Sequence, residues 1–364
     1  MLVLFNVIVL LCFVVPPGFW FEMPRIDLEV YRLGADMWLS GGDLYGLLPA
    51  TSTGHLPFTY PPFAAVVFAP FALAPYVVAS MVWTLLSVAA LVLVLVVVLR
   101  SLDVRPSAAL VGALLPVALL LEPVRATLFF GQINLLLMAL VVLDCLVRQP
   151  RWPRGMLVGL AAAIKLTPAA FVLFFLLRGD RRAAVTALVS FLGATAVGFA
   201  LNPAGSVRYW TSIVFDPDRI GGVASGANQS VKGFLARLGI EQGLTWLVLA
   251  AVAVVIGAIA IRKAWHPVDA LCVNAFVVLL ASPVSWTHHW VWMVPVLLAA
   301  WRIMPALAMG GAALFMLAPQ WWSGTLGFVL GNAYLWCAIG VLVWRSANRQ
   351  FRWTRVDVDH RAVA

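Results

Sequence analysis

The chain has 364 residues, of which 63% are hydrophobic and 11% charged, and its formal net charge is +9. Soluble domains contain about 25% charged residues, so this composition excludes a soluble globular protein and indicates one that crosses a membrane several times. The positive charge does not indicate a nucleic-acid partner, because the cations lie at the edges of apolar runs, and the four cysteines, which lie within such runs without CxxC spacing, are typical of buried core residues.

The N-terminal part of the chain contains an expected crossing, an acidic loop and a proline-rich segment. Residues 1–15 are apolar but lack the basic start and cleavage site of a signal peptide, so we expect a first transmembrane helix. The loop 16–60 contains the most acidic stretch of the chain. Residues 58–76 are apolar but contain four prolines, which predicts an interfacial or re-entrant helix rather than a full span of about 20 residues. Residues 77–99 form a clean span that ends at Arg100.

The middle of the chain contains a segment that does not fit a single crossing. Residues 107–121 and 133–147 are expected to cross out and back. Residues 155–177 are long enough to span, but arginines flank both ends, and one crossing would put one of these clusters outside. Lys165 and Pro168 near its centre predict instead two short helices that meet at the sequence IKLTP. Broken helices around a polar centre often line a substrate site.

The remaining apolar runs complete the predicted topology. Further crossings are expected at residues 183–201, 244–261, 268–281, 290–301, 303–319 and 326–344, with a long polar outer loop at 202–243. Because most Lys and Arg residues then fall on one side, the positive-inside rule puts both termini in the cytoplasm. The predicted fold is an all-α polytopic membrane protein with about 10–12 transmembrane helices. Residues 1–344 form its membrane domain and 345–364 a basic cytoplasmic tail.

The outer loops hold most of the polar residues that have no role in topology, and the first loop holds Asp27. A carboxylate just outside the bilayer is suited to act as a general base that deprotonates a sugar hydroxyl. The alternatives for Asp27 are a helix N-cap or an ion pair with Arg25. Glu29 ranks second, because it points elsewhere if this segment is helical.

Cations and histidines in these turns are candidates for binding a lipid phosphate. Lys165 costs about 2.5–3.5 kcal/mol in lipid, so it must face a cavity, snorkel to the interface or find an anion. Arg125 is a second candidate, because its guanidinium can bind two oxygens, and a pair with Glu122 is the alternative. His288 and His289 are adjacent, and no HxxxH or ExxH pattern completes a metal site. Hydrogen bonding to a phosphate or sugar is therefore favoured over metal binding.

Six stretches, in order over about residues 20–300, resemble a known family. They are DLEVYRLGADMWLSGGDLY, FTYPPF, FFGQINLLLMAL, AAAIKLTPAAFVLFFLLRGDRRAA, NQSVKG and SPVSWTHHW. Together they are similar to glycosyltransferase family 87, the actinobacterial polyprenol-phosphate-mannose-dependent α-1,2-mannosyltransferases of GT-C type, one of which acts on phosphatidylinositol mannosides. The resemblance implies a GT-C fold for residues 1–344, a polyprenyl-phosphate-mannose donor, and an extracytoplasmic site in the plasma membrane. It also implies no sugar nucleotide, in keeping with the lack of Gly-rich nucleotide motifs.

The resemblance also bears on individual residues. The essential aspartate of the family lies in the first outer loop and matches Asp27. The family's donor-phosphate histidine matches SPVSWTHH, where we favour His289 over His288. With the two cations, the donor phosphate-binding candidates are Lys165, Arg125, His289 and His288. The substrate-binding candidates lie in the same outer turns: Glu29, Tyr31, Tyr60, Gln132, Asn134, Asn228, Gln229 and Trp286. No metal or other cofactor is expected.

The predicted function is inverting transfer of mannose to a mannosyl glycolipid of the cell envelope. The expected partners are the lipid-linked donor, the glycolipid acceptor and membrane lipids. Because the family also includes an arabinofuranosyltransferase, a polyprenyl-phosphate-arabinose donor is an alternative. A transporter or flippase of lipid-linked sugars would explain the two short helices at 155–177 and Lys165 equally well, but it would not need an acidic first loop. A structural subunit would leave the polar turns without a purpose.

Overall fold

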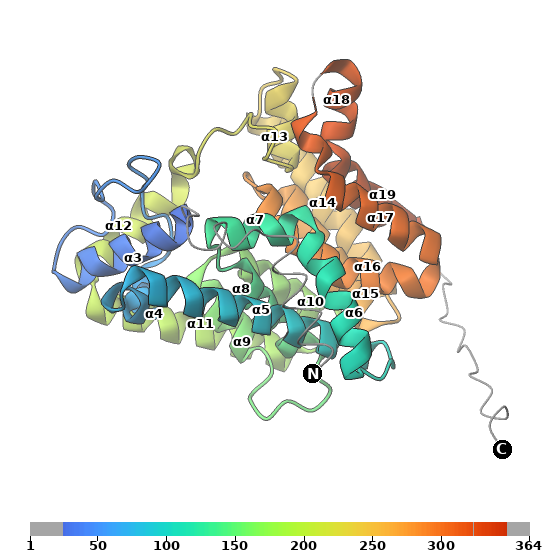
Figure 1. The fold of residues 1–364 in the computed structure, drawn as a ribbon, viewed down its shortest axis with the longest axis horizontal. Helices are drawn as coiled ribbons and strands as arrows, with labels where there is room; N and C mark the ends of the chain where they lie inside the picture. The colour runs from blue at the N-terminus through green and yellow to red at the C-terminus, as the bar shows by residue number, and fades with distance from the viewer. Residues whose placement is uncertain (1–24, 323, 348–364) are drawn as a thin grey trace.

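The computed structural model describes residues 25–322 and 324–347, and their regular secondary structure is helical (Figure 1). Within these residues, β-structure is limited to two isolated bridges, Thr51 with Gly54 and Asn228 with Trp286. The all-α polytopic class predicted from the sequence is confirmed. The expected first helix at 1–15 lies outside the described residues, as does the basic tail beyond the end of α19, which runs past the predicted boundary at 344.

Among the described residues, three helices are long and apolar enough to cross a membrane: α5 (Tyr76–Ser101), α11 (Arg181–Leu201) and α14 (Gly243–Lys263). Apolar side chains of α11 and α14 are exposed along their length, as in Leu188 at 54% and Leu247 at 55%. Apolar surface of this extent is stable in contact with lipid and not with water. These two helices therefore form part of the lipid-facing surface.

The other helices are shorter, and several are broken spans. The short apolar ones are α4 (Pro62–Leu73), α8 (Asn134–Leu146), η1 with α10 (Thr167–Phe171 and Val172–Leu177), α15 (Pro267–Ala281) and α19 (Ala333–Ala347). The remaining elements are α3 (Ile26–Leu39), α6 (Ala108–Leu120), α7 (Glu122–Phe130), α9 (Met156–Ile164), α12 (Pro203–Thr211), η2 (Ile213–Phe215), η3 (Pro217–Ile220), α13 (Val231–Arg237), η4 (Thr287–Trp292), α16 (Met293–Ile303), α17 (Pro305–Leu317), η5 (Pro319–Trp321) and α18 (Gly324–Gly331). The proline-rich segment 58–76 thus forms one short helix, α4, before α5 begins.

Breaks within the apolar segments decide where polar residues meet. The predicted break at Lys165 is present: α9 ends at Ile164, Lys165 is extended with φ −144° and ψ 127°, and η1 begins at Thr167. Pro168 in the first turn of η1 lacks the backbone N–H that would continue α9. The break leaves the Lys165 side chain at the junction of two short helices.

One further break was not anticipated from the sequence. The 75° bend between α6 and α7 falls at the predicted end of the span 107–121, and the expected outer turn after it forms the short helix α7. The expected span 326–344 is divided between α18 and α19 at Asn332. The Asn332 side chain accepts a hydrogen bond from Arg237 and donates one to the carbonyl of Phe328, 2.7 Å away. These hydrogen bonds satisfy polar groups at the end of α18, within an otherwise apolar segment.

A buried carboxylate anchors the start of α9. Asp144 of α8 is fully buried and accepts hydrogen bonds from the backbone N–H groups of Gly155 and Val158, both at 2.9 Å, and from Trp152 Nε1 at 3.0 Å. Backbone N–H groups at a helix start have no partner within the helix, so Asp144 satisfies them. Gly155 has φ +97°, and a Cβ at this position would lie 1.9 Å from the backbone of α11. Helix α9 is thereby fixed between α8 and α11.

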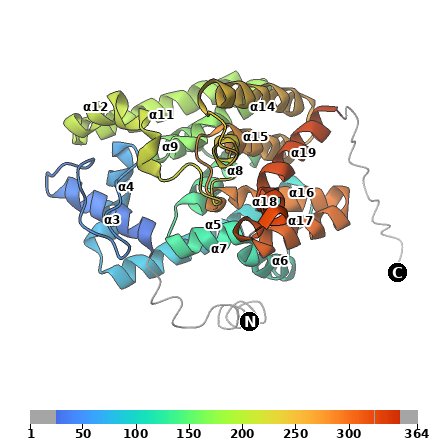
Figure 2. The ribbon, with the colours of Figure 1, turned by 90° about the horizontal axis from the view of Figure 1, so that it is seen from above.

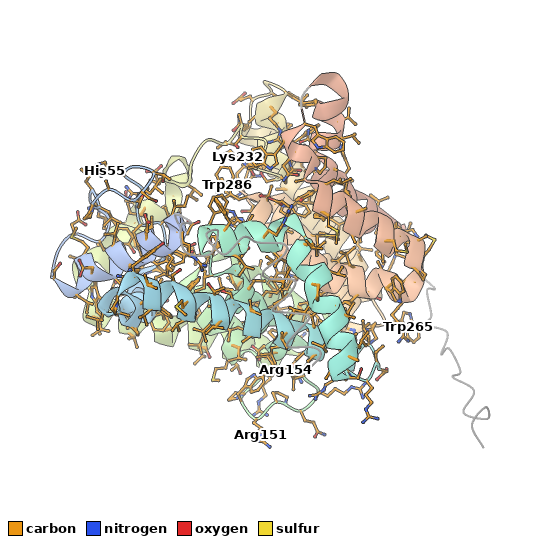
Figure 3. The ribbon with its side chains drawn as sticks, viewed as in Figure 1. His55, Arg151, Arg154, Lys232, Trp265 and Trp286 are labelled. Atoms are coloured by element: carbon orange, nitrogen blue, oxygen red, sulfur yellow. The ribbon has the colours of Figure 1, made fainter. Side chains whose placement is uncertain are left out.

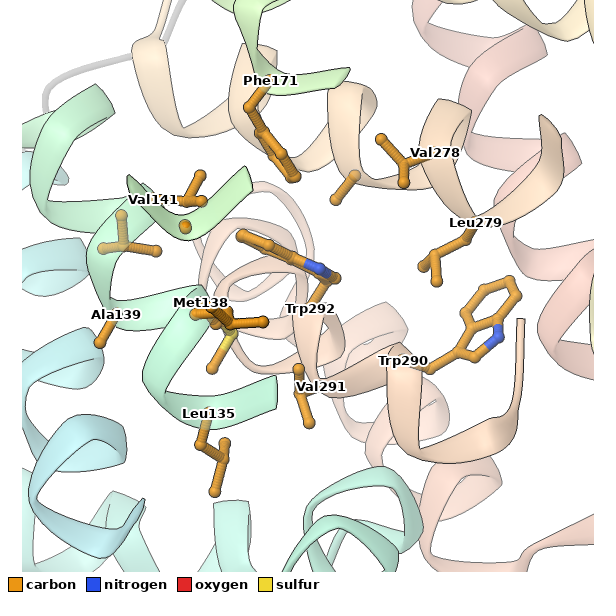
Figure 4. Packing of buried hydrophobic residues seen from close by; sticks show 14 of the residues in the cluster. Leu135, Met138, Ala139, Val141, Phe171, Val278, Leu279, Trp290, Val291 and Trp292 are labelled. Atoms are coloured by element: carbon orange, nitrogen blue, oxygen red, sulfur yellow. The ribbon is translucent and has the colours of Figure 1, made fainter. Parts of the chain in front are cut away.

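The hydrophobic core joins α8 and α15 to the chain that leads into α16 (Figure 4). Helix α15 is buried along almost its whole length. Trp290 and Trp292 of η4 project into this core, where the ring of Trp292 lies 4.6 Å from that of Phe171 in η1. This packing holds η4, which carries the two adjacent histidines, against the broken helix that carries Lys165.

The view from above places α3, α4 and α12 at one end of the molecule and α16 to α19 at the other (Figure 2). The chain between α12 and α13 runs from one end towards the other across the top of the molecule in Figure 1. The short helices α8 and α9 lie between the two ends. Residues of α3, α7, α12, α14 and α15 line a common space in this region.

Candidate active site

A cavity of about 690 Å³ lies in this middle region, and it brings together residues that are far apart in the sequence. Its polar lining comprises Asp27, Thr59, Tyr60, Gln132, Lys165, Thr167, Tyr209, Asp216, Arg219, Ser282, Trp286, His288 and His289. The remainder is largely apolar, and part of it comes from η1, α10, α14 and α15, including Leu173, Val254 and Val277. The cavity thus offers a charged and hydrogen-bonding part next to an apolar part, which suits an amphipathic ligand.

Asp27 lies in the first turn of α3, and neither of the structural roles considered for it is found. The N-cap position belongs to Arg25, and no side chain caps the helix. The guanidinium of Arg25 instead donates to the Ser80 carbonyl at 3.3 Å and to Thr84 Oγ1. The Asp27 carboxylate faces the cavity, where it hydrogen-bonds with Gln132 and is attracted by the ammonium of Lys165. It is therefore available to a substrate.

Gln132 is held in one orientation by two tyrosines. Its Oε1 accepts hydrogen bonds from Tyr31 OH at 2.9 Å and from Tyr60 OH at 3.2 Å, and the two hydroxyls lie 2.8 Å apart. With Oε1 occupied in this way, the amide Nε2 is the group that donates to the Asp27 carboxylate. Tyr31 is fully buried and does not line the cavity, so its part is to orient Gln132.

The environment of Asp27 makes its carboxylate a stronger base than an exposed one. Burial raises the pKa of Asp27 to about 6, and the hydrogen bond from Gln132 and the charge of Lys165 limit the rise. The group is still ionised at neutral pH. A carboxylate with a pKa close to the working pH is well matched to general base catalysis.

Lys165 supplies a positive charge to the same site. Its Nζ donates to Asn134 Oδ1 at 3.0 Å, lies 3.4 Å from His289 Nε2 and is 5.4 Å from the centre of the Tyr60 ring. An ammonium has three donor hydrogens, and these contacts with neutral groups leave its charge without a carboxylate in direct contact. A buried cation of this kind is a natural partner for an anionic ligand.

The two histidines have different surroundings. His289 Nε2 is the ring atom next to Lys165, whereas His288 packs edge-on against Phe130 at 5.6 Å and its buried Nε2 has no partner among the described residues. Burial and the nearby Lys165 hold the pKa of both imidazoles well below the usual range, so both are neutral at pH 7. Among the described residues, no group of three or more His, Cys, Asp or Glu side chains could hold a metal ion.

Asn134 positions other residues rather than lining the cavity. Its Oδ1 accepts from Lys165, and its Nδ2 donates to the carbonyl of His288 at 2.9 Å. Thr127 Oγ1 donates to the same carbonyl at 3.0 Å. Both polar ends of Asn134 are thus used to join the Lys165 junction to the histidine turn.

Several other predicted site residues lie away from the cavity. Glu29 accepts hydrogen bonds from the backbone N–H and the hydroxyl of Ser52, at 2.8 and 3.1 Å, on another face of α3. Arg125 is exposed and donates to the carbonyl of Met316 at 3.3 Å. Asn228 and Gln229 are fully buried.

The two amides nevertheless shape the site from behind. Asn228 Oδ1 accepts from the backbone N–H of Ser285 at 2.9 Å, and Asn228 forms a β-bridge with Trp286. Gln229 N donates to the carbonyl of Ser285 at 2.8 Å. These bonds hold the Ser285–Trp286 turn against the long loop, so that the Trp286 ring faces the cavity.

Among the polar lining residues that the sequence analysis did not assign to the site are Tyr209, Asp216 and Arg219. They lie in the long loop and its helix α12, among many other polar residues. Local sequence gives no sign of which of these turn inward, because that depends on contacts with the first loop. The Arg219 guanidinium, for example, donates to the carbonyl of Tyr45 at 3.2 Å.

Comparison with known proteins finds relatives over most of the chain. The chain is 40% identical over 361 residues to the polyprenol-phosphate-mannose-dependent alpha-(1-2)-phosphatidylinositol mannoside mannosyltransferase of Mycobacterium tuberculosis, covering 88% of this chain and 84% of that protein. It is 39% identical to the protein of the same name from Mycolicibacterium smegmatis, with 88% and 83% covered. It is 36% identical to the corresponding pentamannoside mannosyltransferase of Mycolicibacterium smegmatis, with 81% and 76% covered.

No solved structure gives a significant match. Residues 58–283, more than half of the chain, match the model of glycosyltransferase family 87. The resemblance inferred from the six sequence stretches is thereby confirmed. The chain belongs to glycosyltransferase family 87.

Proposed function

We propose that this protein transfers mannose from polyprenyl-phosphate-mannose to a mannose of a glycolipid acceptor and forms an α-1,2 linkage with inversion. The relatives named above are polyprenol-phosphate-mannose-dependent and act on phosphatidylinositol mannosides, which supports this donor and this class of acceptor. The observation that carries the proposal is the placement of Asp27 and Lys165 in one cavity, each with its charge facing a shared space.

In the proposed reaction, Asp27 is the general base. It accepts the proton of the acceptor's 2-hydroxyl while that oxygen forms a bond to the anomeric carbon of the donor. Gln132 holds the carboxylate by its amide N–H, and the two tyrosines hold Gln132. Because nucleophile and leaving group occupy opposite faces of the anomeric carbon, inversion requires the base and the phosphate site to lie on opposite sides of the donor sugar.

Lys165 is the proposed site of the departing phosphate. The bond between the anomeric carbon and the phosphate oxygen breaks, and polyprenyl phosphate leaves with the electron pair. The ammonium stabilises the charge that develops, and His289, next to Lys165 Nζ, is placed to hydrogen-bond a second phosphate oxygen. Phosphate is already a good leaving group, so no acid is required. Arg125 has no part in this step, since it lies on the exposed face of α7.

The apolar part of the cavity supports a lipid-linked donor. Leu173, Val254 and Val277 extend the lining from Lys165 towards α14, whose outer side chains are exposed as expected for contact with lipid. A chain of isoprene units bound along this surface would leave its phosphate at Lys165. The cavity therefore matches both halves of the donor, the charged head and the apolar tail.

We also propose that the cavity opens on the outer side of the plasma membrane and that both termini are cytoplasmic. The side chains of Arg151 and Arg154 project at the opposite end of the molecule from Trp286 and His55 (Figure 3). Basic loops remain preferentially in the cytoplasm. The basic loop between α8 and α9 is thus the expected cytoplasmic end, which supports an extracytoplasmic active site.

Incubation of the purified protein with radiolabelled polyprenyl-phosphate-mannose and a mannosyl glycolipid tests the proposal. We expect labelled glycolipid with a new α-1,2-linked mannose, and no product from polyprenyl-phosphate-arabinose. Product from the arabinose donor alone would assign the other sugar. Movement of intact donor across proteoliposomes without any glycosidic product would contradict transferase activity and indicate a transporter.

A further inference from the structure

The cavity contains a second group of polar residues, on the chain between α12 and α13, that the proposed chemistry does not use. Asp216 and Arg219 line the cavity together with Tyr209 and Trp286. Arg219 donates through one terminal nitrogen to the carbonyl of Tyr45 at 3.2 Å, while its buried Nε has no partner among the described residues. A buried, unpartnered donor in a cavity wall is costly unless a ligand satisfies it.

Contacts through three tyrosines hold this group at a fixed place relative to Lys165. Tyr60 contacts Lys165 through its ring, Tyr45 OH donates to the carbonyl of Tyr60 at 2.8 Å, and the carbonyl of Tyr45 binds Arg219. The Tyr209 ring lies 5.6 Å from that of Tyr45. The two cations therefore both line the cavity and are joined by a chain of contacts through Tyr60 and Tyr45.

The loop that carries Arg219 is also packed against Trp286. Gly221 has φ +114°, a conformation that favours glycine, and a Cβ at this position would lie 3.1 Å from the indole ring of Trp286. Figure 3 shows Trp286 beside the connection that runs from α12 to α13 in Figure 1. Close packing of this loop on the indole keeps the guanidinium and the aromatic rings at one mouth of the cavity.

We infer that Arg219 and Asp216, flanked by Tyr209 and Trp286, form a subsite for the neutral sugar headgroup of the acceptor. The guanidinium can donate to two sugar hydroxyls and the carboxylate can accept from others, while the aromatic rings pack against the apolar face of a pyranose. A carboxylate in the same subsite disfavours a phosphate there. This inference rests on the proposed function. It adds the residues of the cavity that bind the acceptor.

The position agrees with the geometry of inversion. The acceptor must approach the face of the donor sugar opposite to the phosphate, and hence from the side away from Lys165. A headgroup held at Arg219 is separated from that cation by the contacts through Tyr60 and Tyr45.

The test is a pair of KM measurements on Arg219→Ala. We expect the KM for the acceptor to rise about 10- to 100-fold, the loss expected for hydrogen bonds to a charged group, with little change in the KM for the donor. Arg208→Ala is the matched control: Arg208 pairs with Asp43 on the surface of α12, and its loss should change neither KM. Arg219→Lys keeps the positive charge but not the planar guanidinium, so its KM for the acceptor should lie between those of the wild type and Arg219→Ala.

Two acceptors separate sugar recognition from phosphate recognition. A synthetic alkyl α-mannoside has no phosphate, so the same rise in KM for it and for a phosphorus-containing glycolipid supports the sugar subsite. A rise for the glycolipid alone would assign Arg219 to the acceptor's phosphate and overturn the inference. An unchanged acceptor KM, or an equal rise for the donor, would overturn it as well. Failure of the proposed function is seen separately, as the absence of mannosyl transfer by the wild-type protein.

Discussion

Each end of α9 has a carboxylate nearby, one bonded within the protein and one facing the cavity. Asp144, beside the start of the helix, is fully buried and accepts three N–H hydrogen bonds. At the other end, Lys165 follows the last turn of α9, and Asp27 lies near it. The Asp27 carboxylate faces a cavity and has Gln132 as its hydrogen-bonding partner. Both carboxylates are shielded from bulk water. They differ in whether the protein itself satisfies them, and only Asp27 has capacity left for a substrate.

The comparison carries a physical lesson about α9. The helix is rigidly placed because Asp144 satisfies its first turn and because glycine allows close contact with α11. That rigidity is useful at the other end, about 14 Å away for a nine-residue helix, where Lys165 must be held at a defined position. A functional group on a fixed element loses little freedom when the substrate binds.

A large effect at the catalytic end is expected for Lys165→Met, which keeps most of the length of the side chain but removes its charge. We expect kcat to fall about 10²- to 10³-fold, as when a group that stabilises transition-state charge is removed. Lys232→Met is the control, because Lys232 lies over the Trp246 ring, 5.1 Å from its centre and outside the cavity. Turnover by Lys165→Met at the wild-type rate would remove Lys165 from the phosphate site.

At the structural end, Asp144→Asn is expected to reduce stability and not the chemistry. The amide can accept but cannot satisfy all three donors, so the free energy of unfolding should fall by about 1–3 kcal/mol. The measurement is the melting temperature in detergent, together with kcat of the protein that remains folded. A variant with a wild-type melting temperature and no transfer would contradict a purely structural role for Asp144.

The pH dependence gives a smaller effect that sharpens the same distinction. Burial raises the pKa of Asp27 to about 6, and the base must be ionised to act. Transfer should therefore fall about tenfold per pH unit below this pH, as the carboxylate is protonated. The donor's phosphodiester stays ionised throughout this range, so it does not contribute. A profile without an acid limb near pH 6 would contradict the role of Asp27.

Sequence patterns predicted much of this arrangement. The break at IKLTP followed from basic clusters at both ends of one apolar run, and the importance of Asp27 followed from its place in the acidic loop. Both features depend on local sequence and on the position of the membrane. The structure brings these two residues into one cavity, together with Gln132 and both histidines.

Other features could not be read from local sequence. Arg125 and Lys165 are both cations near predicted outer turns, but the bend between α6 and α7 leaves Arg125 exposed. Asn228 appeared as available as Gln132, yet it is fully buried and bonded to the Ser285 turn. The place of Arg219 in the cavity lining could not be predicted, because it depends on a contact with Tyr45, a residue far away in the chain. Which way a polar residue faces depends on such long-range partners.

The central claim is that Asp27 is the base, and Asp27→Asn tests it most directly. The amide has nearly the shape of the carboxylate but cannot accept the proton. With purified protein, donor binding and transfer to the glycolipid should be measured side by side. We expect unchanged donor affinity and transfer slower by about 10²- to 10⁴-fold. Transfer at a rate close to that of the wild type would contradict the claim and require another residue in the cavity as the base.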